Sequence, residues 1–152
     1  MCVGTTKHDS PRRRWLYPVV GRASGVNRRA LLLVPAAVFL PGSVAFAVLS
    51  PPHTILTAVL LGCFFVAGFG FAVAGLRASV PVGGRDVPWY AFAGVADVAL
   101  GVGMVLNATR MLGGGAEDAF LSAVTAVSGL PLLFVGVDYL RGGRHFDLTA
   151  FE

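Results

Sequence analysis

The chain has 152 residues, of which 55% are hydrophobic and only 13% are charged, about half the charged fraction of an ordinary soluble domain, which is about 25%. The mean hydropathy is +0.74, and a water-soluble core of this size cannot hide so much apolar surface. The net charge is +4, and most basic residues stand beside apolar stretches. Contact with anionic lipid headgroups explains these positions better than binding of nucleic acid does. Composition therefore predicts an all-α integral membrane protein and excludes a nucleic-acid-binding domain.

Residues 1–29 form a polar, basic segment before the first apolar stretch. Pro11, Pro18, Gly21 and Gly25 interrupt it, so we expect a cytoplasmic tail that is poorly ordered or lies on the membrane surface. Binding of a cytoplasmic partner and a start-site artefact are the alternatives. The arginines expected to contact anionic headgroups are Arg12, Arg13, Arg14, Arg28 and Arg29.

Four apolar stretches follow, at residues 30–49, 54–76, 88–112 and 119–140. A helix rises about 1.5 Å per residue and the hydrocarbon core is about 30 Å thick, so a spanning helix needs about 20 mainly apolar residues. Each stretch meets that length. The sequence predicts a transmembrane domain over residues 30–140, built as a four-helix bundle of two antiparallel hairpins, and a short cytoplasmic tail over residues 141–152.

Arginine is concentrated on one side of the predicted membrane. The joint between the second and third stretches holds Arg77 and Arg85, and the C-terminal tail holds Arg141 and Arg144. The two joints on the opposite side have Arg110 alone at their border. The positive-inside rule then predicts that both termini are cytoplasmic, in a cell membrane. The tryptophans and tyrosines stand near the same ends: Trp15, Tyr17, Trp89, Tyr90 and Tyr139.

The first stretch also resembles a twin-arginine export signal. Arg28 and Arg29 precede the apolar run, and residues 45–47 form an A-x-A cleavage pattern. Cleavage would leave three spans and a mature chain starting at Val48. An uncleaved first span is favoured because the preceding segment is long for a signal, and N-terminal sequencing distinguishes the two alternatives.

Asp97 is the most informative residue at membrane depth. It lies about nine residues into the third stretch, which places it about 14 Å deep, near the bilayer centre. An Asp at mid-span costs about +2.5 to +3.5 kcal/mol on insertion scales. The carboxyl must therefore be protonated, paired, hydrated or turned towards other helices. Ala93, Gly94 and Gly101 share its face, so a neighbouring helix can approach closely there.

Counting the same depth along the other helices brings Ser43 and Ser128 to the level of Asp97. The hypothesis is an ion or proton site formed by Asp97, Ser43, Ser128 and carbonyls freed by proline, as in transporters with interrupted helices. The alternative is a neutral Asp97 that acts as a hydrogen-bond clip between helices. The predicted helix breaks are Pro41, Gly42, Gly129 and Pro131.

Other polar residues suggest local roles. Asn107 and Arg110 could form an outer cluster with Glu117 or Asp118, or Arg110 could extend to the interface. Asp138 is expected to pair with Arg141, three residues later. Pairs of small residues spaced by four favour close helix packing within one chain or between copies. They are Ala58 with Gly62, Gly68 with Ala72, Gly70 with Ala74, Ala99 with Gly103, and Ala119 with Ala123.

Chemical motifs are missing from the sequence. His8, His53 and His145 are far apart, Cys2 and Cys63 form no C-x-x-C pair, and no nucleophile elbow, P-loop or zinc-protease motif occurs. We expect no enzyme, no metal and no cofactor. The favoured function is a structural or accessory membrane protein that packs with itself or with a larger membrane complex. The alternative is a small transporter or channel subunit with a proton or cation site at Asp97.

Overall fold

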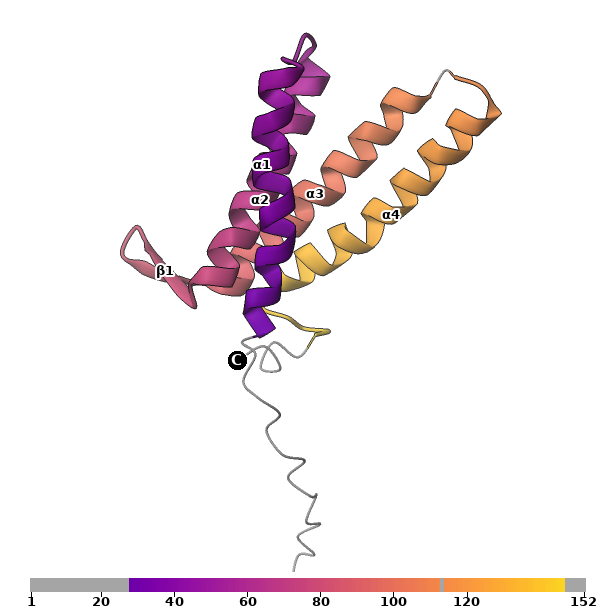
Figure 1. Cartoon of the computed structure of the whole chain (residues 1–152). Helices are drawn as coiled ribbons and strands as arrows, with labels where there is room; N and C mark the ends of the chain where they lie inside the picture. Colours follow the sequence, from indigo (N-terminus) through magenta and orange to yellow (C-terminus); the bar gives the residue numbers. More distant parts are fainter. Residues whose placement is uncertain (1–27, 113, 147–152) are drawn as a thin grey trace, which may run out of the picture.

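The computed structural model describes residues 28–112 and 114–146, in which long helices predominate (Figure 1). A 3-10 helix, η1 (Arg28–Leu32), continues into α1 (Leu33–Leu49). The other long helices are α2 (Ile55–Leu76), α3 (Trp89–Met111) and α4 (Ala116–Leu140). With η1 and α1 taken together, four helices are long and apolar enough to cross a membrane, which confirms that prediction. The largest difference in bounds is at α4, which begins at Ala116 instead of residue 119.

The helix ends follow from local backbone chemistry. The hydroxyl of Thr54 accepts a hydrogen bond from the backbone N–H of Thr57 at 3.2 Å, which caps the start of α2. At the end of α4, Gly142 and Gly143 have φ values of 85° and 68°, a left-handed conformation that glycine adopts easily. The N–H of Gly143 then bonds the carbonyl of Asp138 at 2.9 Å. The chain consequently reverses after α4 and returns towards it.

A β-hairpin connects α2 to α3, and the sequence analysis treated this segment only as a joint. Strand β1 (Ser79–Val82) pairs antiparallel with β2 (Arg85–Pro88), with Val82 opposite Arg85. Gly83 and Gly84 have φ values of 57° and 79°, as a two-residue hairpin turn of type I′ requires. The Gly-Gly pair between two valine-containing segments was the available signal.

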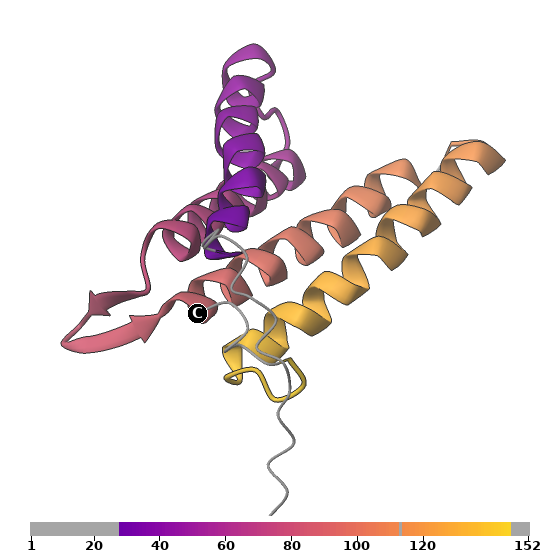
Figure 2. The same cartoon turned by 60° about the horizontal axis from the view of Figure 1, so that its bottom comes forward.

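The four long helices form two hairpins that diverge from one another. Figures 1 and 2 show α1 beside α2 and α3 beside α4, with the hairpins close together near β1 and spread apart towards their turns. The main core lies near the crossing of α2 and α3. It consists of Ala36, Ala67, Phe71, Ala96 and Leu100. Because most of these side chains are small, the backbones approach closely at the crossing.

The contact between α3 and α4 depends on facing glycines. A Cβ atom on Gly94 would lie 2.8 Å from the carbonyl oxygen of Gly136, and a Cβ atom on Gly136 would lie 2.8 Å from the carbonyl oxygen of Gly94. Gly101 and Gly129 face each other in the same reciprocal way at 2.9 Å. Real Cβ atoms do not come that close to a carbonyl, so each of the four positions requires glycine at this helix separation.

A hydrogen bond continues this contact at the same spacing. The buried Ser122 hydroxyl of α4 donates to the carbonyl of Ala108 on α3 at 2.8 Å. Ala108 lies seven residues after Gly101, and Ser122 lies seven residues before Gly129. The two antiparallel helices therefore meet once every seven residues, a heptad repeat of small residues. We call the three contacts the α3–α4 seam: Gly94 with Gly136, Gly101 with Gly129, and Ala108 with Ser122.

Helix α2 lies between the other elements and uses further glycines. A Cβ on Gly68 would lie 2.9 Å from the backbone nitrogen of Leu40 on α1, and a Cβ on Gly70 would lie 2.8 Å from the carbonyl of Phe92 on α3. Helix α1, in contrast, buries only Ala36 and Ser43. The first helix is thus the most peripheral element and depends on α2 for its position.

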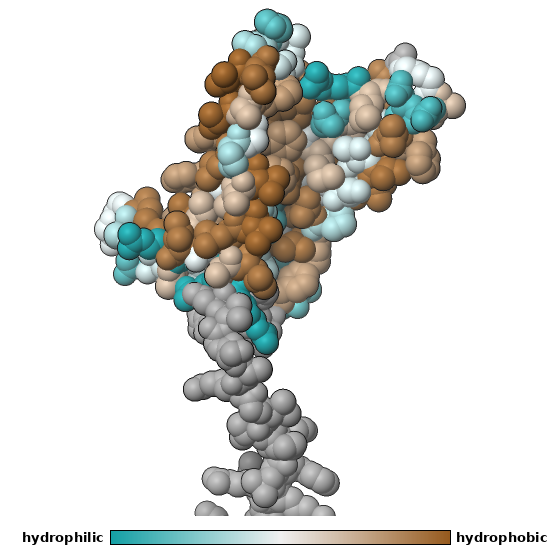
Figure 3. All heavy atoms as spheres, viewed as in Figure 1, coloured by the Kyte–Doolittle hydropathy of each residue, from teal (hydrophilic) through white to brown (hydrophobic). Residues whose placement is uncertain are grey.

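The outer surface of the helices is apolar. Figure 3 shows hydrophobic residues along the helices and hydrophilic residues gathered at the turns and the β-hairpin. Large side chains that a soluble protein would bury are exposed, including Val48, Leu49, Ile55, Leu76 and Phe120. This distribution is compatible with an integral membrane protein, in which lipid tails contact the helices and polar groups stay at the ends.

Candidate functional site

Asp97 lies on α3 between the faces that contact α2 and α4. Its neighbours on α3 are buried: Ala93 and Ala96 are fully covered, and Gly94 and Gly101 belong to the α3–α4 seam. The Asp97 side chain itself is only 8% exposed. The structure thus places the acid inside the bundle at mid-helix, turned away from lipid, which is one of the four ways the sequence left open for tolerating it.

No hydrogen bond or ion pair to the Asp97 carboxylate forms within residues 28–112 and 114–146. A hydrogen-bond clip between helices needs a partner for the acid. The part of the chain that the structure describes supplies none, so the clip interpretation loses its main support.

The structure does not bring the two serines to Asp97 as hydrogen-bond partners. The Ser43 hydroxyl donates to the carbonyl of Phe39 at 2.6 Å, within its own helix. The Ser128 hydroxyl donates to the carbonyl of Val124 at 2.7 Å, and Ser128 is exposed on α4. Both serines therefore form the usual helical bond to a preceding carbonyl, and the ion site of Asp97, Ser43 and Ser128 stays a prediction.

The predicted helix breaks are not breaks. Pro41 and Pro131 lie inside continuous helices, α1 and α4, and both side chains are exposed. Each proline removes one hydrogen bond without ending its helix. Gly42 is also exposed, whereas Gly129 is a contact residue of the α3–α4 seam. The comparison with interrupted transporter helices therefore does not hold for these positions.

The basic residues of the first segment divide into two groups. Arg28 and Arg29 begin η1, with Arg28 exposed and Arg29 half-buried at the end of the bundle that carries the β-hairpin. Arg12, Arg13 and Arg14 lie outside the described residues. Contact of all five with anionic headgroups stays a prediction.

Asp138 has a different partner from the one expected. Its carboxylate lies 2.7 Å from Nδ1 of His145 and accepts the His145 backbone N–H at 3.2 Å, whereas Arg141 forms no ion pair within the described residues. The reversal through Gly142 and Gly143 returns His145 to the helix, so the sequence-based pairing of Asp138 with Arg141 is wrong. The ring of Phe134 lies against that of His145, with centroids 5.6 Å apart, and Phe146 contacts the rings of both Phe134 and Tyr139.

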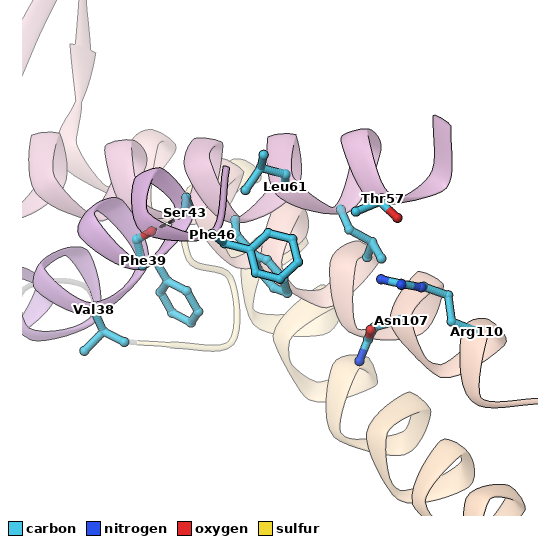
Figure 4. A pocket seen from close by; sticks show the side chains of 11 residues that line it. Val38, Phe39, Ser43, Phe46, Thr57, Leu61, Asn107 and Arg110 are labelled. Carbon is cyan, nitrogen blue, oxygen red and sulfur yellow. Dashed lines mark hydrogen bonds between the residues drawn. The ribbon is translucent and has the colours of Figure 1, made fainter. Parts of the chain in front are cut away.

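The structure contains a cleft that the sequence analysis did not anticipate. It occupies about 340 Å³ between the diverging hairpins, and we call it the hairpin cleft (Figure 4). Its lining includes the stacked rings of Phe39 and Phe64, whose centroids are 5.9 Å apart. The lining comes from three helices: Val38, Phe39, Gly42, Ser43 and Phe46 of α1; Thr57, Leu60, Leu61 and Phe64 of α2; and Asn107 and Arg110 of α3.

Arg110 and Asn107 are the strongly polar groups on the α3 side of the hairpin cleft. Figure 4 shows the Arg110 side chain reaching from α3 towards the cleft, on the side of Thr57 and Phe46. The outer cluster expected with Glu117 or Asp118 does not form, since neither acid pairs with Arg110 in residues 28–112 and 114–146. The sequence signal that was available is the presence of a single arginine at this end of the bundle.

Comparison with known proteins identifies a family. A family model described as a family of unknown function (DUF7994) matches residues 26–152, which include every residue that the structure describes. No curated protein and no solved structure matches the chain. The comparisons therefore give no function for this chain.

Proposed function

Because the chain belongs to the DUF7994 family, whose function is unknown, we propose from its own geometry that it is a small multi-pass protein of the cell membrane with a structural or accessory, non-catalytic role. It packs with copies of itself or with a larger membrane complex. The observation that carries this proposal is a groove on the α1–α2 hairpin that none of the described residues fills.

The groove exposes small residues that the other described helices do not cover. Gly62 and Ala58 are one turn apart on α2, both are exposed, and no described atom lies within 4 Å of a Cβ built on Gly62. The groove continues along Val44, Ala47 and Phe65. Pairs of small residues let the backbone of a second helix approach closely in a membrane. Comparable glycines at Gly68 and Gly70 are already occupied by α1 and α3.

Substitution of Gly62 by leucine tests this assembly. The new side chain fills the groove without meeting the chain's own atoms, so the monomer keeps its fold while close approach of a partner helix is blocked. We expect the complex that is purified in mild detergent to lose mass when measured by light scattering. Gly42→Leu is the matched control because Gly42 is equally open but lines the hairpin cleft. A wild-type protein that is monomeric and partner-free would refute the proposal.

The orientation that we propose places both termini in the cytoplasm. What supports it is the position of arginine: Arg110 stands at the end with the two short turns, whereas the other six described arginines lie at or beyond the opposite helix ends. They are Arg28, Arg29, Arg77, Arg85, Arg141 and Arg144.

Single-cysteine labelling checks the orientation. In a background without Cys2 and Cys63, His53→Cys is expected to react with a membrane-impermeant maleimide added to intact cells. Arg85→Cys at the β-hairpin is expected to react only after lysis. The reverse pattern would place the arginine-rich end outside and contradict the positive-inside assignment.

A transporter or channel subunit is the second candidate function. It is favoured by one observation, the buried Asp97 carboxylate with no bonding partner among the described residues. Acids inside membrane bundles are often proton or cation sites. In this alternative, the binding site is Asp97 with water or with groups of a second chain, since Ser43 and Ser128 bond their own helices.

A further inference from the structure

The hairpin cleft has an apolar interior and a cationic mouth. Phe39, Phe46 and Phe64 of α1 and α2 line it, and Figure 4 shows the rings of Phe39 and Phe46. Arg110 and Asn107, one turn apart on α3, supply hydrogen-bond donors on the opposite side. The hairpin cleft is thus apolar inside and positively charged at one end, which matches a molecule with an apolar tail and an anionic head.

No carboxylate of the described residues neutralises the charge of Arg110. Arg110 is exposed and lies one residue before the end of α3 at Met111, which is the depth of lipid headgroups if α3 spans the bilayer. No carboxylate pairs with it within the described ranges, although Glu117 and Asp118 begin α4 across the turn. A guanidinium presents its N–H donors as a fork that matches a phosphate group.

The chemistry of the lining decides what the hairpin cleft fits. Its walls are mainly apolar side chains of α1 and α2, and its strongly polar groups, Asn107 and Arg110, lie on the α3 side. An alkyl chain fits the apolar walls, and a phosphate fits the Arg110 guanidinium, which has no carboxylate partner among the described residues. We propose that the hairpin cleft holds one acyl chain of an anionic phospholipid from the surrounding bilayer, whose phosphate binds Arg110 at the cleft mouth.

Photo-crosslinking with defined lipids tests this proposal at the level of the residue. The full-length protein is reconstituted in vesicles that contain a phospholipid with a diazirine near the end of one acyl chain. The headgroup is either phosphatidylglycerol or phosphatidylcholine, at equal mole fraction, and mass spectrometry locates the labelled residues. We expect Phe39, Phe46 and Phe64 to be labelled by the anionic lipid about tenfold more than by the zwitterionic one, the ratio expected for one charge-assisted contact.

Two pairs of variants separate the charge from the cavity. Arg110→Gln should reduce labelling by phosphatidylglycerol to the phosphatidylcholine level, whereas Arg85→Gln, which removes an exposed arginine from the β-hairpin, should leave it unchanged. Gly42→Leu fills the cleft and should reduce labelling by both lipids, whereas Gly62→Leu, on the other groove, should not. Circular dichroism and the elution volume confirm that each variant is folded.

Three results would overturn the assignment. Equal labelling of the cleft by the two headgroups in the wild type would remove the role of Arg110. Labelling that persists in Arg110→Gln would place the anion elsewhere. A protein crosslinked to the cleft residues in native membranes, in place of lipid, would make this surface a protein contact.

Discussion

Replacement of Gly101 by alanine is expected to destabilise the protein, although the same change at Gly42 or Gly62 should not. In an open helical position, Gly→Ala contributes up to about 1 kcal/mol through helix propensity. At Gly101 the added methyl would lie 2.9 Å from the carbonyl oxygen of Gly129 and 2.8 Å from Leu133. Overpacking of this kind costs about 1 to 3 kcal/mol, and a backbone carbonyl cannot rotate away as a side chain can.

The matched controls are Gly62→Ala and Gly42→Ala, where a Cβ meets no described atom within 4 Å. We expect a difference of about 2 to 4 kcal/mol in the free energy of unfolding between Gly101→Ala and these controls. Unfolding by increasing mole fractions of SDS in mild detergent, followed by circular dichroism, measures it. Equal stability of Gly101→Ala and Gly62→Ala would show that the α3–α4 seam is looser than its geometry implies.

A double substitution makes the same prediction more specific. Gly94 and Gly136 face each other across the α3–α4 seam, so the first methyl pushes the helices apart and the second meets a gap that already exists. The cost of Gly94→Ala with Gly136→Ala should therefore be smaller than the sum of the single changes. Gly94→Ala combined with Gly68→Ala, which touches α1 instead, should be closer to additive.

Length and hydropathy were sufficient to predict the four helices, but not how they face one another. In a soluble helix the apolar stripe marks the buried side, whereas in lipid every side of a spanning helix is apolar. Counting depth predicted Ser43 and Ser128 at the level of Asp97, but depth says nothing of direction around a helix. Ser43 lines the hairpin cleft, whereas Asp97 is buried on α3 and is not part of that lining.

The α3–α4 seam was nonetheless visible in the sequence at another spacing. The pairs considered were four residues apart, which is the spacing of crossing helices. Gly94 and Gly101, and Gly129 and Gly136, are seven residues apart, as expected where two antiparallel helices stay in contact over several turns. A search for small residues seven apart would have marked these four glycines as candidate contact residues, together with Gly68 and Gly75 of α2, which face α1.

The error at Asp138 has a local cause. The expected partner, Arg141, lies three residues later, a spacing that brings side chains together only while the helix continues. Helix α4 ends at Leu140, and Gly142 and Gly143 reverse the chain. His145 thereby replaces Arg141 as the partner. Two successive glycines directly after an apolar stretch were the signal that such a reversal follows.

Replacement of Asp97 is expected to increase the membrane insertion of α3 strongly, because the carboxyl opposes insertion. On insertion scales, an Asp at mid-span costs about 3 kcal/mol and a Leu contributes about −0.5 kcal/mol, a difference of about 3 to 4 kcal/mol. Asp97→Leu in the isolated segment of residues 89–111 should therefore strongly increase its insertion, as measured by glycosylation mapping in microsomes. An unchanged inserted fraction, where the wild-type segment is not already fully inserted, would mean that Asp97 does not reach the hydrocarbon.

In the intact protein, Asp97→Asn separates the proposed roles of the carboxyl. With no bonding partner among the described residues, the acid contributes no interaction that the amide would lose, so we expect the stability in detergent to be the same or higher. A loss of more than about 1 kcal/mol, the usual value of one hydrogen bond, would instead reveal a structural partner, such as a group of a second chain.

Proton flux then decides between the two functions. In liposomes that carry a pH gradient and an internal pH dye, a proton site at Asp97 predicts that the wild type dissipates the gradient and that Asp97→Asn does not, because an amide cannot release a proton in this range. If the protein has an accessory role, the wild type and Asp97→Asn should dissipate the pH gradient at the same slow rate. If both proteins are stable and equally silent, the acid is retained at an energetic cost without transport, and a partner that bonds Asp97 inside a larger complex becomes the remaining explanation for its position.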